Sequence, residues 1–315
     1  MTSMAVSLMK TKNAERILII GVDSLIGRTL FENLQRSDKI VLGTTRRKET
    51  LSEERIFLDL DENISSWVFP EKIAVAFFCV AISSLDYCHR EPLKTARINV
   101  DNTVKLAEKL AKAGTFVVFF STNLVYDGAV PFIKADAPVS FQTEHGRQKA
   151  TAEKRLLAFG NLIAVLRLTK IFGPDMPLLQ EWILALQNRK VIHPFSDKVV
   201  SPLPLSLGIE VSCRVAQKRT SGIVQVSGDR DVSYAQIANR VAERLGVNRD
   251  LVAPIPSLES GILLEHQPKC TTLDTTRLVK ELGMKAPDVL LTIDQAIDQN
   301  IATLQRKGHS EVATL

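Results

Sequence analysis

The run RILIIGVDSLIG, residues 16–27, constrains the fold of this chain more than any other stretch. Residues 17–20 are continuously apolar, which is typical of a parallel strand covered on both faces. Small residues follow: Gly21 allows a sharp turn, Ser24 keeps side-chain bulk low, and Gly27 lets a helix lie close to the sheet. The run therefore predicts a buried strand, a tight turn and a helix.

The start of that helix predicts an anion site. Its first amides have no partner within the helix and carry the positive end of the helix dipole, which suits the pyrophosphate of a dinucleotide. The residues that we expect to bind this ligand are Gly21, Ser24, Leu25, Ile26 and Gly27. The alternative is a strand-to-helix turn with no ligand, because glycine motifs of this kind also occur without one.

Strands and helices alternate along the first 172 residues. Apolar runs predict further strands at 39–45, 55–58, 73–80, 115–120 and 162–168, and helical patterns separate most of them, at about 25–36, 93–113 and 144–159. This alternation predicts an α/β fold with a doubly wound parallel sheet, the Rossmann arrangement. A ligand then lies at the carboxyl ends of the strands.

The pattern changes after residue 172. Helical patterns occur at about 176–189, 205–217, 233–245 and 289–306, with short apolar runs such as 222–228 between them. We expect residues 1–172 to form a dinucleotide-binding Rossmann domain. We expect residues 173–315 to form a second, smaller α/β lobe that binds the substrate, with some of its segments returning to the Rossmann sheet.

Composition excludes several classes of protein. The 315 residues are 45% hydrophobic and 24% charged, and the net charge of +5 is scattered without basic stripes or aromatic platforms, so nucleic acid is not an expected partner. No apolar segment reaches the roughly 18 residues that span a bilayer. Residues 1–14 show no cleavage-like site, so we expect a frayed leader, no membrane partner and a cytoplasmic location. Cys79, Cys88, Cys213 and Cys270 form no CxxC pair, which predicts reduced thiols and no metal site.

The end of the second predicted strand indicates which dinucleotide is bound. An NAD-binding fold usually has an acidic residue there, whereas this chain has Arg46 and Arg47 after two threonines. Two guanidinium groups suit a 2′-phosphate, which favours NADP(H) over NAD(H); the alternative is a solvated basic turn. Asp59 and Leu60 follow the third strand, where they can meet the adenine. Val80 and Ala81 end the fourth, where the backbone can approach the cofactor closely.

Polar side chains that can carry chemistry follow the fifth strand. Ser121, Thr122 and Asn123 lie at its carboxyl end, and His145 and Lys149 stand four residues apart in the next helical segment. That spacing places both on one face of a helix.

At this point the chain resembles the extended short-chain dehydrogenases/reductases, most closely the dTDP-4-dehydrorhamnose reductase (RmlD-like) branch of nucleotide-sugar enzymes. The resemblance extends over nearly the whole chain. It is carried by the glycine turn, the Asn99–Val100 pair, STNLVYDG at 121–128, RLTKIFG at 167–173 and QPKCTTLDTTRL at 267–278. The family's middle glycine, an arginine and an aspartate are replaced here by Ser24, Gln267 and Asn123.

The resemblance implies a Ser/Thr, a Tyr and a Lys in a YxxxK pattern. The lysine holds the nicotinamide ribose and lowers the tyrosine pKa, the tyrosine exchanges a proton with the substrate oxygen, and the hydroxyl fixes that oxygen. Thr122, or its neighbour Ser121, matches the hydroxyl, Lys149 matches the lysine, and His145 stands at the tyrosine position. The implied catalytic residues are therefore Thr122, His145 and Lys149, with Ser121 and Lys149 also against the cofactor and Asn123 and Thr169 against the substrate.

The histidine changes the expected chemistry. A neutral imidazole is a poor acid, and both Lys149 and an oxidised nicotinamide disfavour the imidazolium form. Loss of a matched general acid costs ~10²–10⁴ in rate. His145 then works at lower pH or through a water, or it only fills the space of the tyrosine in a binding pocket. Tyr87 and Tyr126 are expected to be structural.

Two functions follow. The first is an NADP-dependent oxidoreductase that acts on a nucleotide-linked sugar, as a 4-keto-sugar reductase or epimerase-like enzyme, in polysaccharide biosynthesis, with a homodimer as the candidate assembly. The second is a catalytically silent regulatory subunit that binds a dinucleotide or a nucleotide sugar. The regulatory beta subunit of methionine adenosyltransferase shows that this branch also serves in that way.

Overall fold

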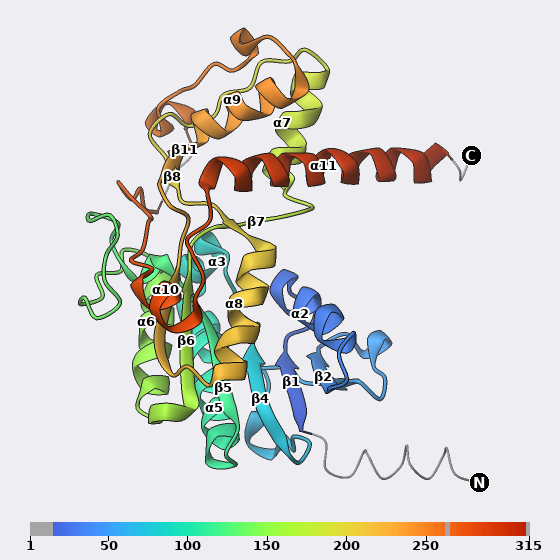
Figure 1. Cartoon of the computed structure of the whole chain (residues 1–315), viewed down its shortest axis with the longest axis vertical. Helices are drawn as coiled ribbons and strands as arrows, with labels where there is room; N and C mark the ends of the chain where they lie inside the picture. Colours follow the sequence, from blue (N-terminus) through green and yellow to red (C-terminus); the bar gives the residue numbers. More distant parts are fainter. Residues whose placement is uncertain (1–14, 262–264, 313–315) are drawn as a thin grey trace. The chain divides into compact units, whose positions relative to one another are not determined.

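The computed structural model describes residues 15–261 and 265–312, and the expected leader at 1–14 lies outside them. The described chain divides into two compact units (Figure 1). The first contains the residues up to Ser121 together with Glu144–Leu166 and Ser212–Ile223. The second contains Thr122–Thr143, Arg167–Val211 and the residues from Val224 onward.

A seven-stranded sheet is built from the predicted apolar runs. Its order is β10-β6-β5-β4-β1-β2-β3, and β1 pairs in parallel with both β2 and β4, as do β2 with β3 and β4 with β5. The strands are β1 (Arg16–Ile20), β2 (Ile40–Thr45), β3 (Arg55–Phe57), β4 (Ile73–Phe78), β5 (Phe116–Thr122), β6 (Ile163–Leu168) and β10 (Gly222–Val226). The doubly wound α/β fold is thereby confirmed, since the chain passes from β1 to β2 and β3 on one side and to β4 and β5 on the other.

Helices connect these strands. They are α2 (Leu25–Gln35), α3 (Leu85–Arg90), α4 (Pro92–Ala96), α5 (Thr103–Lys112), α6 (Glu144–Leu157) and α8 (Leu205–Lys218). In Figure 1, α2 lies beside β1 and β2. The prediction of one helix over 93–113 was wrong in its middle, because a π-helical segment, η3 (Arg97–Asn102), separates α4 from α5. π-Helical turns inside helices frequently occur at functional sites.

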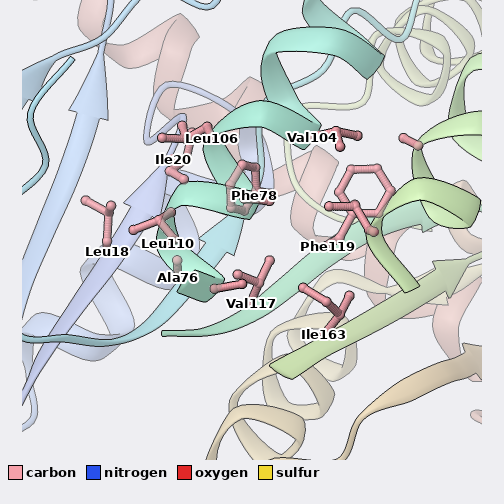
Figure 2. Close-up of a cluster of buried hydrophobic side chains, with 14 of the residues drawn as sticks. Leu18, Ile20, Ala76, Phe78, Val104, Leu106, Leu110, Val117, Phe119 and Ile163 are labelled. Atoms are coloured by element: carbon pink, nitrogen blue, oxygen red, sulfur yellow. The ribbon is translucent and has the colours of Figure 1, made fainter. Parts of the chain in front are cut away.

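Apolar packing of α5 on the sheet holds the first unit together (Figure 2). Leu106 and Leu110 of α5 are fully buried, and the same cluster contains Ile20 of β1, Phe78 of β4 and Phe119 of β5. Burial of this kind stabilises a fold by about 25 cal/mol per Å² of apolar surface. The cluster therefore fixes the strands whose carboxyl ends carry the candidate site.

The second unit has its own core. Helices α7 (Pro177–Gln187), α9 (Tyr234–Leu245) and α11 (Val289–Val312) pack together (Figure 1). Two small sheets accompany them, one of β11 (Val232–Ser233) with β8 (Val199–Val200) and one of β7 (Ile171–Phe172) with β9 (Leu203–Pro204). Helix α10 (Thr276–Leu282) completes the helices, and α11 continues beyond the 289–306 predicted.

Short 3-10 turns occur at Lys48–Thr50, Ile64–Ser66, Asn123–Val125, Gly160–Leu162, Arg249–Leu251 and Ser257–Ser260. In the described ranges, no helix has the length and apolar character needed to cross a membrane. The four cysteines carry free thiols, with Cys88 and Cys270 buried and Cys79 and Cys213 half-buried.

Candidate functional site

A cavity of about 460 Å³ lies at the carboxyl ends of β1, β2, β3 and β4 in the first unit. The residues predicted to bind the cofactor that line it are Gly21, Ser24, Arg46, Arg47, Asp59, Leu60, Val80 and Ala81. The lining residues that were not predicted are Ile20, Asp23, Thr44, Thr45, Leu58, Ile82 and Ile98. Except for Ile98, these residues lie within two positions of a predicted one. Proximity in the sequence was therefore the signal that could have found them.

The turn between β1 and α2 leaves no room for side chains at its two glycines. Gly21 has a φ of +91°, and a Cβ there would lie 2.9 Å from the Val80 Cβ. A Cβ on Gly27 would lie 2.1 Å from the Gly21 carbonyl oxygen. The Gly21 amide also donates to the Thr44 hydroxyl at 3.0 Å, which ties the turn to the end of β2.

Ser24 does more in this turn than keep bulk low. Its side chain is the N-cap of α2: the hydroxyl accepts from the Gly27 amide at 3.1 Å and donates to the Gly21 carbonyl at 2.9 Å. In the described part of the chain, the amides of Leu25 and Ile26 have no hydrogen-bond acceptor. Leu25, Ile26 and Gly27 do not line the cavity themselves, but two donors remain at this helix terminus for an anion.

Two guanidinium groups stand at the end of β2. Arg46 and Arg47 are exposed, line the cavity, and form no ion pair with any carboxylate of the described residues. The nearby Asp23 carboxylate accepts from the Thr45 hydroxyl at 2.7 Å, which holds it against β2. The basic pair is therefore available to an external anion.

His145 lies on α6 and is 95% buried, with 5% of its surface exposed. Its Nδ1 lies 3.1 Å from the carbonyl oxygen of Ile82. A carbonyl only accepts, so the hydrogen of the neutral ring is on Nδ1. Burial, and next the charge of Lys149, lower the pKa of His145 from 6.5 to about 4, although the bond to Ile82 opposes the shift.

Lys149 follows His145 by one helical turn and is also buried. Its Nζ donates to the Phe120 carbonyl at 2.7 Å and lies 4.4 Å from the centre of the Phe119 ring. Burial lowers the pKa of Lys149 to about 8, and the buried carboxylate of Glu153 opposes that shift. Glu153 in turn accepts a hydrogen bond from the Ser121 hydroxyl. Neither Lys149 nor Ser121 lines the cavity.

The remaining predicted residues fall in the second unit. Thr122 is the last residue of β5, and its hydroxyl accepts from the Leu124 amide at 3.2 Å, so it caps the turn that begins at Asn123. Thr169 is buried, and its hydroxyl has no partner in the described residues. Tyr126 donates to the Lys134 carbonyl at 2.9 Å, which agrees with a structural role.

Comparison with known proteins defines the family. The model for the RmlD substrate binding domain matches residues 15–301, and the chain belongs to this family. Methionine adenosyltransferase 2 subunit beta of Rattus norvegicus is 24% identical over 289 residues, which cover 87% of this chain and 85% of that protein.

Two solved structures share the fold. The dTDP-4-dehydrorhamnose reductase of Bacillus anthracis, in complex with NADP, has a TM-score of 0.78 at 17% identity, and the match covers 91% of this chain and 100% of that chain. MoeE5, in complex with UDP-glucose and NAD, has a TM-score of 0.75 at 22% identity, with 92% and 99% covered.

Gly27→Ala tests the close approach at the turn. We expect the free energy of unfolding to fall by about 1–3 kcal/mol, because the new methyl group collides with the Gly21 carbonyl. Gly208→Ala in α8 is the control: its Cβ would have only the Ile171 Cδ1 nearby, at 3.9 Å. Urea unfolding measures both, and equal stability of the two variants would contradict the packing described.

The pKa of His145 predicts how stability depends on pH. Between pH 6.5 and 4 the unfolded chain binds a proton at this residue that the folded protein does not bind, so stability falls as the pH drops through this window. The loss is about 3 kcal/mol in total. Urea unfolding from pH 7 to pH 4 should show it, and His145→Gln should remove it. His193→Gln, at an exposed histidine, controls for loss of an imidazole; an unchanged slope in His145→Gln would refute the assignment.

Proposed function

We propose that the chain is an NADP(H)-binding protein that also binds a nucleotide-linked sugar and turns it over poorly, serving as a regulatory subunit. The observation that carries this proposal is a cavity of about 460 Å³ at the strand ends together with a neutral, buried His145. The cavity supports binding of a dinucleotide, whereas a neutral histidine lacks the proton that the family's chemistry needs.

The residues of the first unit fit a dinucleotide. Gly21 and Gly27 form a turn without Cβ atoms, the amides of Leu25 and Ile26 have no acceptor among the described residues, and the cavity measures about 460 Å³. These features match what a pyrophosphate at a helix terminus requires. When bound, a nicotinamide dinucleotide supplies or accepts a hydride. The cavity lies where the sheet order reverses, between β1 and β4, which is the usual ligand position in this class of fold.

Arg46 and Arg47 support NADP(H) over NAD(H). One solved relative is in complex with NADP and another with NAD, so the family likeness alone does not choose between them. The exposed basic pair at the end of β2 favours NADP(H), because a 2′-phosphate can pair with both guanidinium groups.

Two structural relatives support a nucleotide-linked sugar as the ligand. They are a dTDP-4-dehydrorhamnose reductase and a protein in complex with UDP-glucose. In this proposal Lys149 holds the nicotinamide ribose, Thr122 fixes the substrate oxygen, and Asn123 and Thr169 contact the sugar. A homodimer, a cytoplasmic location and a link to polysaccharide biosynthesis stay predictions.

The second candidate function is an NADP-dependent oxidoreductase that reduces a 4-keto sugar or acts as an epimerase. Lys149 favours it, because its ammonium group is held in place by Phe120 and balanced by Glu153, as a working ribose-binding lysine requires. Proton supply disfavours this function, since His145 with a pKa of about 4 is almost entirely neutral at pH 7. The first proposal, a regulatory subunit, is supported by the similarity to methionine adenosyltransferase 2 subunit beta.

Calorimetry tests the cofactor. We expect NADPH to bind more tightly than NADH, and the double variant Arg46→Ala/Arg47→Ala to lose about tenfold or more in NADPH affinity, the value of one charged hydrogen bond or more. NADH affinity should not change. Arg36→Ala/Lys39→Ala removes the same charge from exposed residues outside the cavity and should bind normally. If NADPH, NADP, NADH and NAD all give no heat of binding, the proposal is wrong. If the double variant loses equal affinity for NADH and NADPH, the 2′-phosphate contact is excluded.

Turnover separates the two candidate functions. We expect the purified protein to bind NADPH and to oxidise it only slowly from pH 5 to 9 on a panel of keto-sugar nucleotides, because a matched proton donor is missing. His145→Tyr should raise NADPH oxidation by about 10²-fold or more, as expected on restoring a general acid. Fast turnover by the natural protein that is lost in His145→Tyr would instead identify His145 as the working acid.

A further inference from the structure

The Ile82 carbonyl fixes the orientation of His145. It accepts from His145 Nδ1 at 3.1 Å, from Asn99 Nδ2 at 2.9 Å and weakly from the Cys88 thiol at 3.4 Å. The Ile82 amide donates to Asn99 Oδ1 at 2.8 Å, and Asn99 also donates to Gln148 on α6 at 2.7 Å. The main chain at Ile82 is therefore held at both its amide and its carbonyl, and the imidazole ring is fixed with its hydrogen on Nδ1.

The opposite ring nitrogen, Nε2, is left to act as an acceptor. Over residues 15–261 and 265–312, no group forms a hydrogen bond with it. The Nε2 atom of His266 also has no partner among the described residues, but it is sealed from solvent, whereas Nε2 of His145 is not sealed. In the neutral tautomer with the hydrogen on Nδ1, Nε2 has a lone pair and nothing to donate.

The surrounding charges keep the ring in that state. The cation on Lys149 opposes a second positive charge on His145. Carboxylates on α6 and on the elements packed against it are engaged elsewhere: Glu144 by Arg147, Asp86 by Arg90, Asp101 by Arg155, Glu108 by Lys112 and Glu153 by Ser121. Within the described part of the chain, no carboxylate therefore pairs with the His145 ring to stabilise the imidazolium.

We propose that Nε2 of His145 makes this site select a sugar hydroxyl over a ketone at the position that the family's tyrosine contacts. This inference rests on the proposed binding of a nucleotide-linked sugar. A hydroxyl donates its hydrogen to Nε2 and satisfies both groups. A ketone oxygen instead presents lone pairs to a lone pair, and leaves both acceptors unpaired in a buried place. The ligand class is therefore the alcohol form of a nucleotide-linked sugar.

A matched pair of ligands tests the proposal without any turnover. dTDP-rhamnose and dTDP-4-dehydrorhamnose differ only in the oxidation state of one carbon. Calorimetry without added dinucleotide should show the alcohol binding about tenfold more tightly, the value of one buried hydrogen bond. His145→Phe should reduce that preference to about twofold or less, and His193→Phe, at an exposed histidine, should keep it.

Nitrogen-15 NMR of the natural protein gives a second readout that needs no variant. At pH 7 the His145 ring should carry its hydrogen on Nδ1, and the alcohol should shift the Nε2 resonance. A hydrogen on Nε2, or equal or tighter binding of the ketone, overturns the inference alone if NADPH still binds. Binding of NADPH with neither sugar overturns the proposed substrate class and this inference with it.

Discussion

The contact between Gly27 and the Gly21 carbonyl is the constraint on which the candidate site depends. With no Cβ on either glycine, α2 begins directly against the end of β1, and Ser24 caps the helix across the same turn. The result is a helix terminus at the carboxyl end of a central strand, with two amides that have no acceptor among residues 15–261 and 265–312. Any larger residue at Gly27 collides with the Gly21 carbonyl and pushes this terminus away from the sheet.

Ile82 connects that cavity to the candidate chemical centre. Ile82 lines the cavity beyond the end of β4. Its carbonyl accepts from His145, and its amide donates to Asn99. One short segment thus shapes the ligand cavity and sets the tautomer of the histidine. With a pKa of about 4, His145 is neutral at pH 7 beside the buried Lys149, so its ring carries no imidazolium proton to give up.

The sequence was sufficient to predict features that depend on neighbouring residues. The buried strands were predictable because residues such as 17–20 are apolar without interruption, and the sheet confirms that reading. The basic pair Arg46–Arg47 and the four-residue spacing of His145 and Lys149 were equally visible. The capping role of Ser24 was missed because smallness, and not the geometry of its hydroxyl, was considered.

Contacts between segments that are distant in the sequence could not be predicted from the sequence pattern. The bond from His145 to Ile82 joins residues 63 positions apart, and it depends on how α6 packs against the end of β4. The π-helical segment at Arg97–Asn102 has an ordinary helical pattern in sequence. Within it Asn99 is buried and bonds to both the amide and the carbonyl of Ile82, a contact between distant segments that sequence periodicity does not encode.

A crystal structure of the protein with NADPH would show directly whether the first unit holds a dinucleotide by main-chain amides at the start of α2. We expect the pyrophosphate on the amides of Leu25 and Ile26 and the 2′-phosphate between Arg46 and Arg47. A dinucleotide bound elsewhere, or a pyrophosphate that leaves the α2 terminus untouched, would contradict this expectation.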